Sequence, residues 1–162
     1  MVASSSPNLT QPDVLLLDTN MLIIYARAGE PSRRLEAQLG LQSGRSQGMI
    51  SVVTVGEALA FCQKANWGPA RRDTLMDLIH SKLVPIDINR PEILAAYADI
   101  DHYSEKVQKP ARPMGQNDLW IAATAHVLDY ELVTTDRDFD HLQGVKLRRR
   151  WINPDSLRTG KA

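Results

Sequence analysis

Short apolar runs alternate with longer amphipathic stretches along the chain, a pattern typical of parallel strands joined by helices. Five strands are predicted by the apolar runs at residues 14–17, 49–53, 83–88, 131–135 and 145–149. Six helices are predicted by apolar spacings of three and four residues at about 21–28, 32–41, 55–65, 69–80, 91–103 and 117–128. Pro85, inside the third strand, suits a sheet edge, and Pro110, Pro113 and Gly115 predict a loop over 108–116. We therefore expect one α/β domain, a three-layer sandwich with a central parallel sheet of about five strands flanked by helices.

The length of 162 residues fits a single domain with a core of its own. We expect this domain to span residues 13–152, followed by a C-terminal tail at 153–162. Residues 1–12 are polar and rich in serine, lack the pattern of a signal peptide, and are expected to form a disordered leader. The single cysteine, Cys62, has no partner for an internal disulfide, and no apolar run approaches the ~20 residues of a membrane span. A cytoplasmic location is the simplest expectation.

Basic and acidic residues balance at 19 each, so the net charge excludes no class of partner. Their distribution is uneven, because residues 142–162 contain six basic residues and one acidic residue. Two interpretations of this basic segment are open: an edge that contacts phosphates beside an acidic metal site, or a solvated terminal tail.

Four acidic residues, far apart in the sequence, fall where predicted strands end or helices begin. Asp18 directly follows the first strand, and Asp136 follows the fourth. Glu57 lies in the first turn of the helix after the second strand, and Asp118 opens the helix at 117–128. In a parallel sheet, the carboxyl ends of the strands and the helix starts that follow them share one edge, where ligands bind. The four carboxylates are therefore expected to meet in one place.

Such a meeting is unfavourable unless something neutralises the charge. Two carboxylates ~5 Å apart repel each other by roughly 3 kcal/mol at an effective dielectric constant near 20. A group of three or four must take up protons or bind a cation. Because the segments around these acids contain neither histidine nor cysteine, they favour Mg²⁺ or Mn²⁺ over Zn²⁺.

Each acid also has an ordinary structural interpretation. Asp18 could cap a helix, and Glu57 forms a capping-box pattern with Thr54, three residues before it. Asp118 suits a helix start through the helix dipole, and Asp136 suits a turn. These interpretations stay open, since capping and metal binding can coexist.

The segments around the acids resemble the motifs of the PIN-domain nucleases, especially the VapC-type toxins of bacterial toxin–antitoxin pairs. Residues 16–20 (LLDTN) are similar to the first motif, 51–59 (SVVTVGEAL) to the second and 132–139 (LVTTDRDF) to the fourth. Residues 117–123 (NDLWIAA) are similar to the third motif and form the most specific match. The resemblance covers about residues 13–149, with the motifs in the family's order.

The resemblance implies a PIN-like fold, divalent-metal-dependent endoribonuclease activity, frequent homodimers and, for the toxins, inhibition by a cognate antitoxin protein. It implies that Mg²⁺, with Mn²⁺ as a substitute, is held by Asp18, Asp118 and Asp136. Glu57 would complete the site or recruit a second ion. The neighbours that would orient ligands or water are Asn20, Thr134 and Asp138.

The expected reaction is hydrolysis of RNA phosphodiester bonds by metal-activated water. Basic residues near the fourth motif and in the C-terminal segment are candidate phosphate contacts. These RNA-contact candidates are Arg137, Lys146, Arg148, Arg149 and Arg150.

Other functions fit the sequence less well. A receiver domain, with Asp87 as phosphoacceptor and Lys109 as its lysine, would need a second acid directly after Asp18, where Thr19 stands. A phosphatase with a D-x-D motif would need an aspartate in place of Asn20. A catalytically silent PIN domain that binds RNA or protein is the remaining alternative.

Overall fold

The computed structural model describes residues 11–159. Residues 1–10 of the predicted leader and 160–162 of the predicted tail lie outside this range. Within residues 11–159, no helix is both long and apolar enough to cross a membrane.

The centre of the molecule is a five-stranded sheet in which every pair of neighbouring strands is parallel. The strands follow the spatial order β3-β2-β1-β4-β5, which confirms the predicted parallel sheet. Pro85 lies on the edge strand β3, as its missing N–H requires. The strands span Asp13–Leu17 (β1), Ser46–Ser51 (β2), Leu83–Ile86 (β3), Glu131–Thr134 (β4) and Arg149–Trp151 (β5).

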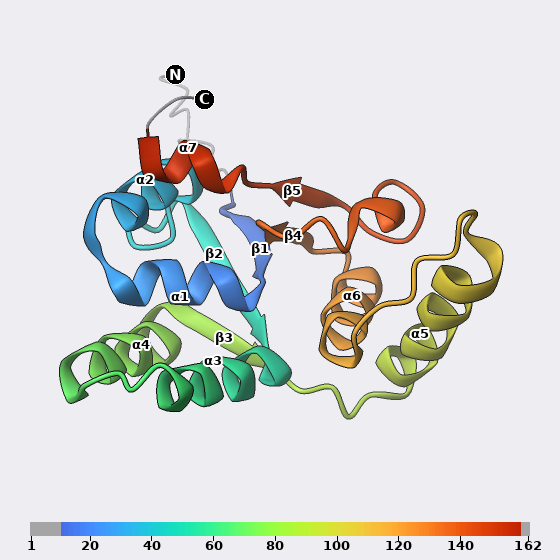
Figure 1. Ribbon diagram of the computed structural model, residues 1–162, viewed down its shortest axis with the longest axis horizontal. Coiled ribbons are helices and arrows are strands. Elements are labelled where there is room, and N and C mark those ends of the chain that lie inside the picture. The colour runs from blue at the N-terminus through green and yellow to red at the C-terminus, as the bar shows by residue number, and fades with distance from the viewer. Residues whose placement is uncertain (1–10, 160–162) are drawn as a thin grey trace, which may run out of the picture.

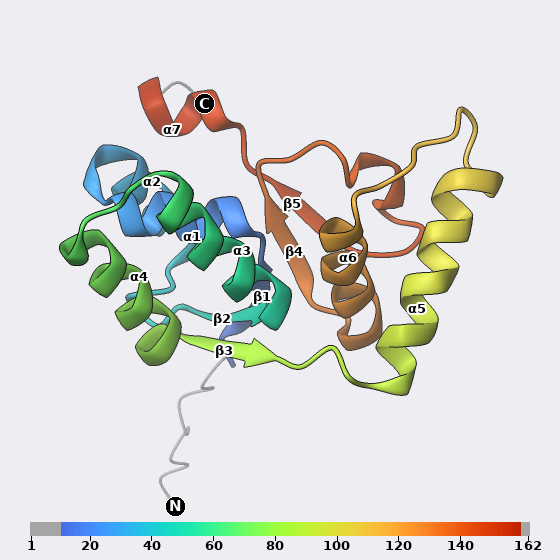
Figure 2. The same ribbon diagram turned by 60° about the horizontal axis from the view of Figure 1, so that its bottom comes forward.

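Helices cover both faces of the sheet. Figures 1 and 2 show α5 and α6 on one side, and α1 to α4 with α7 on the other. A π-helical turn, Tyr103–Val107, extends α5, and a 3₁₀ turn, Asp140–Leu142, follows β4. The α-helices span Thr19–Arg27 (α1), Gly29–Leu39 (α2), Val52–Lys64 (α3), Pro69–Lys82 (α4), Pro91–His102 (α5), Gln116–Leu128 (α6) and Pro154–Thr159 (α7).

The central strand β1 is apolar without interruption because both of its faces are covered. Leu15 and Leu17 pack into the cluster under α1 to α4, whereas Leu16 packs into the cluster under α5 and α6. All three leucines are fully buried, and each contributes roughly 1.5–3 kcal/mol through removal of its side chain from water. This burial holds the carboxyl end of β1 rigidly in the middle of the sheet.

The boundary between β2 and α3 lies earlier than predicted. Val52 and Val53 belong to the first turn of α3 rather than to a strand, and the Ser51 hydroxyl caps this helix by accepting a hydrogen bond from Val53 N at 3.2 Å. Thr54 is therefore not a cap: it is buried inside the helix, and its hydroxyl has no hydrogen-bond partner within the described range. The capping-box interpretation of Glu57 is wrong, and Glu57 lies one turn further into α3 than expected.

The last strand also differs from the prediction. Residues 145–149 were expected to form it, but Gly144 adopts a positive φ of 74° and Val145 is 60% exposed, so the chain turns here instead. The strand begins at Arg149, where it pairs with Leu132 of β4. The segment expected to be a tail contains α7, whose Leu157 is buried in the core.

Candidate active site

The four acids predicted to converge lie along one cleft at the carboxyl ends of the strands. Asp18 follows β1 and Asp136 follows β4, the two neighbouring strands between which the sheet order changes direction. Glu57 comes from α3 and Asp118 from α6, and Figure 2 shows β4 running between these two helices. The structure therefore brings all four side chains to a single cleft of about 510 Å³.

Asp18 forms the deep end of the cleft and is only 5% exposed. It caps α1, because one carboxylate oxygen accepts a hydrogen bond from Thr19 N at 2.6 Å. The other oxygen accepts a hydrogen bond from the Thr134 hydroxyl at 2.7 Å. Burial nevertheless raises the pKa of Asp18 to about 6, and the negative charges of Asp136 and Glu57 add to this effect. Asp18 thus both caps α1 and forms part of the acidic cleft.

Asp118 lies in the first turn of α6, and its side chain is partly exposed to the cleft. Burial is the largest cause that raises its pKa, to about 7, and the charges of Asp18, Asp136 and Glu57 raise it further. No hydrogen bond or ion pair to the Asp118 carboxylate is found among the described residues, so no direct partner within residues 11–159 offsets this repulsion.

The segment after β4 supplies two further carboxylates. Asp136 N donates to the Thr134 hydroxyl at 2.9 Å, and Asp138 N donates to the Asp136 carboxylate at 2.8 Å, so Asp136 is both a turn former and a wall of the cleft. One oxygen from each of Asp118, Asp136 and Asp138 lies within 4.8 Å of the others. The tightest trio therefore includes Asp138, which the sequence placed only among the neighbours of the site, rather than Asp18.

Glu57 lies on the wall formed by α3. One of its carboxylate oxygens accepts a hydrogen bond from the Thr19 hydroxyl at 2.9 Å, which links α3 to the start of α1. Asn20, also predicted as a neighbour, lines the cleft and donates to the Thr135 hydroxyl at 3.3 Å.

Sequence reasoning missed two residues of this wall. Phe61 and Lys64 line the cleft and follow Glu57 by four and seven residues, the spacing of one helix face. Lys64 is the cation among the residues that line the cleft. The spacing was visible in the sequence, because residues four and seven positions after Glu57 share its helix face.

The predicted RNA-contact residues are mostly engaged with carboxylates. Arg149 pairs with Asp140, Lys146 with Asp99 at 2.6 Å, Arg148 with Asp129 at 3.2 Å and Arg150 with Glu131 at 2.8 Å. The guanidinium carbon of Arg137 lies 4.4 Å from the centre of the Trp151 ring, and its nearest carboxylate oxygen, on Asp140, is 4.0 Å away. The excess positive charge of the C-terminal segment is therefore largely neutralised.

The donor set fits a hard divalent cation. All candidate ligands are carboxylate oxygens, burial and the charges of the neighbouring acids raise the pKa of Asp118, and Lys64 is the cation on the cleft wall. Oxygen ligands of this kind suit Mg²⁺ and Mn²⁺, and a cation would remove the repulsion that the charges now impose.

Thr134 is predicted to support this arrangement, because its buried hydroxyl joins Asp18 to the backbone of Asp136. Thr134→Val removes both hydrogen bonds, so we expect it to lower the free energy of unfolding by about 2 kcal/mol. We also expect about 10–100-fold weaker Mn²⁺ binding, as is typical when a residue that orients metal ligands is lost. Urea unfolding and calorimetric titration with Mn²⁺ measure the two effects. Thr134→Ser keeps the hydroxyl and is the control; equal Mn²⁺ affinity in the two variants would contradict this role.

Several solved structures share the fold. The chain matches the complex VapBC2 from Rickettsia felis, bound to a promoter DNA fragment, with a TM-score of 0.69, 20% identity, and coverage of 85% of this chain and 97% of the other. FitAcB from Neisseria gonorrhoeae matches with a TM-score of 0.59 and 22% identity, over 86% and 97% of the two chains. VapC20 from Mycobacterium tuberculosis, described as a sarcin-ricin loop cleaving toxin, matches with a TM-score of 0.59 and 16% identity, over 83% and 98%.

At these identities the solved structures establish the fold alone, and no curated protein sequence matches the chain. The family model described as PIN domain matches residues 15–145, most of the chain. The chain therefore belongs to the PIN-domain family.

Proposed function

We propose that this protein is a divalent-cation-dependent endoribonuclease that hydrolyses RNA phosphodiester bonds, and that it is the toxin of a toxin–antitoxin pair. The observation that carries the proposal is the group of carboxylates in one cleft, where burial, together with the charges of the neighbouring acids, raises the pKa of Asp118 to about 7. Keeping such a cluster costs stability, so it is expected where it serves a ligand.

The residues proposed to hold Mg²⁺, with Mn²⁺ as a substitute, are Asp118, Asp136 and Asp138. Asp18 adds its negative charge from the deep end of the cleft. A divalent cation in such a site would lower the pKa of a water molecule and would offset the negative charge that develops on the phosphate. Thr134 and Thr19 fix the orientation of Asp18 and Glu57 through the hydrogen bonds described above. Glu57 completes the set from the facing wall, with its second carboxylate oxygen available to substrate, water or a second ion.

Membership of the PIN-domain family supports the nuclease assignment, and likeness to structures described as toxin–antitoxin complexes supports the toxin assignment. We propose accordingly that a cognate antitoxin protein binds the chain, that the chain forms a homodimer, and that it acts in the cytoplasm. The alternative is a catalytically silent PIN domain that binds RNA or protein.

Cleavage of RNA by the purified protein tests the enzymatic proposal. End-labelled single-stranded RNA is incubated with Mn²⁺, with Mg²⁺ and with EDTA, and we expect cleavage with either metal and none with EDTA. Asp18→Asn is the matched variant, because asparagine can still cap α1 while the negative charge is lost. Metal-independent cleavage, or undiminished cleavage by Asp18→Asn, would contradict the mechanism, and RNA binding without cleavage would favour the silent alternative.

Brief induced expression in bacterial cells tests the toxin proposal. We expect growth to stop with the wild-type chain and to continue with Asp18→Asn. Co-expression of a short reading frame adjacent to its gene should restore growth if that frame encodes the antitoxin. Growth unaffected by a chain that is active in vitro would remove the toxin assignment and leave the nuclease assignment standing.

A further inference from the structure

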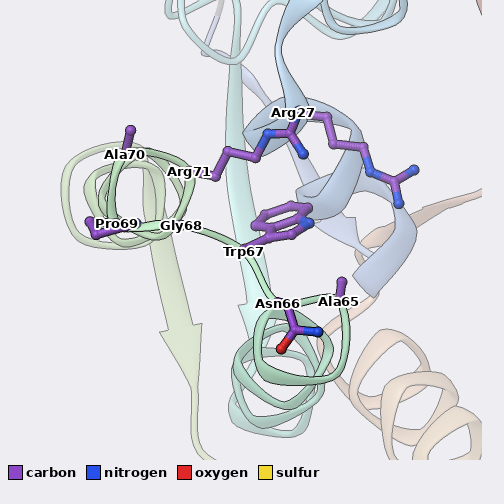
Figure 3. A pocket seen from close by; sticks show the side chains of 8 residues that line it. All are labelled: Arg27, Ala65, Asn66, Trp67, Gly68, Pro69, Ala70 and Arg71. Atoms are coloured by element: carbon purple, nitrogen blue, oxygen red, sulfur yellow. The ribbon is translucent and has the colours of Figure 1, made fainter.

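A second hollow, of about 540 Å³, lies between the end of α1 and the connection from α3 to α4. Figure 3 shows its lining: Arg71 reaches from α4 over the Trp67 ring toward α1, which carries Arg27. We call this hollow the Arg27/Arg71 pocket. The proposed function does not use it.

The two arginines differ from the basic residues of the C-terminal segment. Across residues 11–159, neither Arg27 nor Arg71 has a carboxylate within ion-pair distance. In the C-terminal segment, by contrast, Arg148, Arg149 and Arg150 are each paired with a carboxylate. Aromatic rings hold them instead: the guanidinium carbon of Arg27 lies 5.4 Å from the centre of the Phe61 ring, and that of Arg71 lies 5.8 Å from the centre of the Trp67 ring. A ring contact leaves the N–H donors of a guanidinium available to an anion.

The pocket is suited to a phosphate rather than to a base. Trp67 is 5% exposed and contacts Phe61 edge to face at 5.5 Å, so it forms a rigid floor and offers no open ring face for stacking. The start of α4 adds to the positive potential, because Gly68 at its N-cap has no side chain to satisfy the first backbone N–H groups.

The pocket also continues the acidic cleft. Phe61 lines that cleft and at the same time supports Arg27 and Trp67. Along α3, Glu57 and Lys64 are seven residues apart, which places Lys64 about 10 Å along the helix axis from Glu57, toward the pocket. Lys64 also has no ion pair among the described residues. A line of unpaired cations thus leads away from the carboxylates along one surface.

We propose that the Arg27/Arg71 pocket binds a backbone phosphate of the RNA strand, outside the scissile bond, and that Lys64 contacts the strand between the pocket and the acids. This inference rests on the proposed function, and it assigns the substrate path to α1, α3 and α4. It also provides positive charge beside an acidic cluster that would otherwise repel RNA.

Salt-dependent RNA binding tests the proposal. The affinity for a fluorescein-labelled single-stranded 12-mer is measured by anisotropy without divalent cation, between 50 and 200 mM KCl. Each lost phosphate contact reduces the slope of log K against log[salt] by about 0.7 for single strands, so Arg27→Gln/Arg71→Gln, which removes the one phosphate contact of the pocket, should reduce it by about 0.7. We expect affinity at the lowest salt concentration to fall about tenfold.

The matched control is Arg33→Gln/Arg72→Gln, which also removes two positive charges, but from other exposed positions. Arg72 directly follows Arg71 on α4 but lines a different hollow, with Leu75 and Met76. This control should keep the wild-type slope, and Arg27→Lys/Arg71→Lys should regain most of it, which separates a charge contact from misfolding.

Three results would overturn the proposal. The first is an unchanged slope in Arg27→Gln/Arg71→Gln, and the second is an equal change in the control. The third is an Arg27→Gln/Arg71→Gln variant that binds RNA like the wild type but no longer binds a labelled ten-residue glutamate peptide, which would make the pocket a protein-docking site. This test measures binding and does not depend on cleavage. A wild-type protein that fails to cleave RNA would therefore refute the proposed function, whereas the binding results could still be interpreted.

Discussion

Replacing Asp118 with asparagine is expected to reduce metal-dependent RNA cleavage at least about 100-fold and to leave the metal-free protein more stable than the wild type. Cleavage falls because one member of the closest carboxylate trio is lost. Stability rises because the pKa of Asp118, raised to about 7 by burial and by its acidic neighbours, shows that its charged form is disfavoured in the folded chain. This side chain is partly exposed, and solvent screens the repulsion, so we expect a gain of about 1–2 kcal/mol.

Thermal unfolding in EDTA at pH 8 measures the gain, which corresponds to an increase of about 2–6 °C in the unfolding temperature. Asp73→Asn is the control, because Asp73 is exposed on α4 and lies outside the cleft; it should change neither cleavage nor stability. A destabilised Asp118→Asn variant would show that this carboxylate serves the fold, and full cleavage by it would remove Asp118 from the site.

The metal-free protein is expected to lose stability as the pH rises from 4.5 to 8, and saturating Mn²⁺ should restore it. Asp18 ionises with a pKa of 3.8 in the unfolded chain and about 6 in the folded chain, because burial disfavours its charge. Well below pH 3.8 both states hold the proton, and the buried carboxyl imposes no ionisation cost. As the pH rises, the unfolded chain releases the proton first, so stability falls until the folded carboxyl has ionised above pH 6.

The full cost of ionised Asp18 is about 3 kcal/mol, of which about 2 kcal/mol develops between pH 4.5 and 8. Urea unfolding of the wild type and of Asp18→Asn at both pH values measures this cost together with the repulsion between Asp18 and Asp118. Burial and the nearby charge of Arg112 lower the pKa of His141, which makes stability rise with pH near pH 6, but this effect is present in both proteins and cancels in their difference. Mn²⁺ at 100 times its dissociation constant adds about 2.7 kcal/mol to the wild type. A difference that stays constant with pH would refute the buried-charge account.

The parts of the fold predicted correctly are those that the apolar pattern determines without help from neighbours. The three leucines of β1 and the apolar spacing of α6 each specify their element, since both are buried on the sheet. Pro85 likewise indicated an edge strand, because a missing N–H is tolerated there.

The elements placed wrongly depend on contacts that a sequence window does not contain. Strand β2 begins with polar residues, and a Cβ at its Gly48 would lie 2.4 Å from Leu83 Cδ2, so the Leu83 side chain would have to move to admit one. Strand β5 consists of Arg149, Arg150 and Trp151, all half-buried, and its arginines pair with acids on other elements. Such residues have no apolar alternation to read.

The acidic cleft could be predicted because topology places it. The carboxyl ends of β1 and β4, together with the starts of α3 and α6, meet at one edge in any sheet of this order. Which of the acids lie closest together, and which one is most deeply buried, could not be predicted. The close association of Asp138 with Asp118 and Asp136 depends on a tight turn after β4, and the depth of Asp18 depends on a buried hydroxyl on a neighbouring strand.

Both borders of the sheet resist extension by another chain. At one border, proline removes an N–H that a joining strand would need, and at the other the strand is three residues long and carries two charged side chains. Copies of this protein are therefore protected against edge-to-edge aggregation. If it pairs with itself, we expect the contact to run through helix surfaces rather than through a shared sheet.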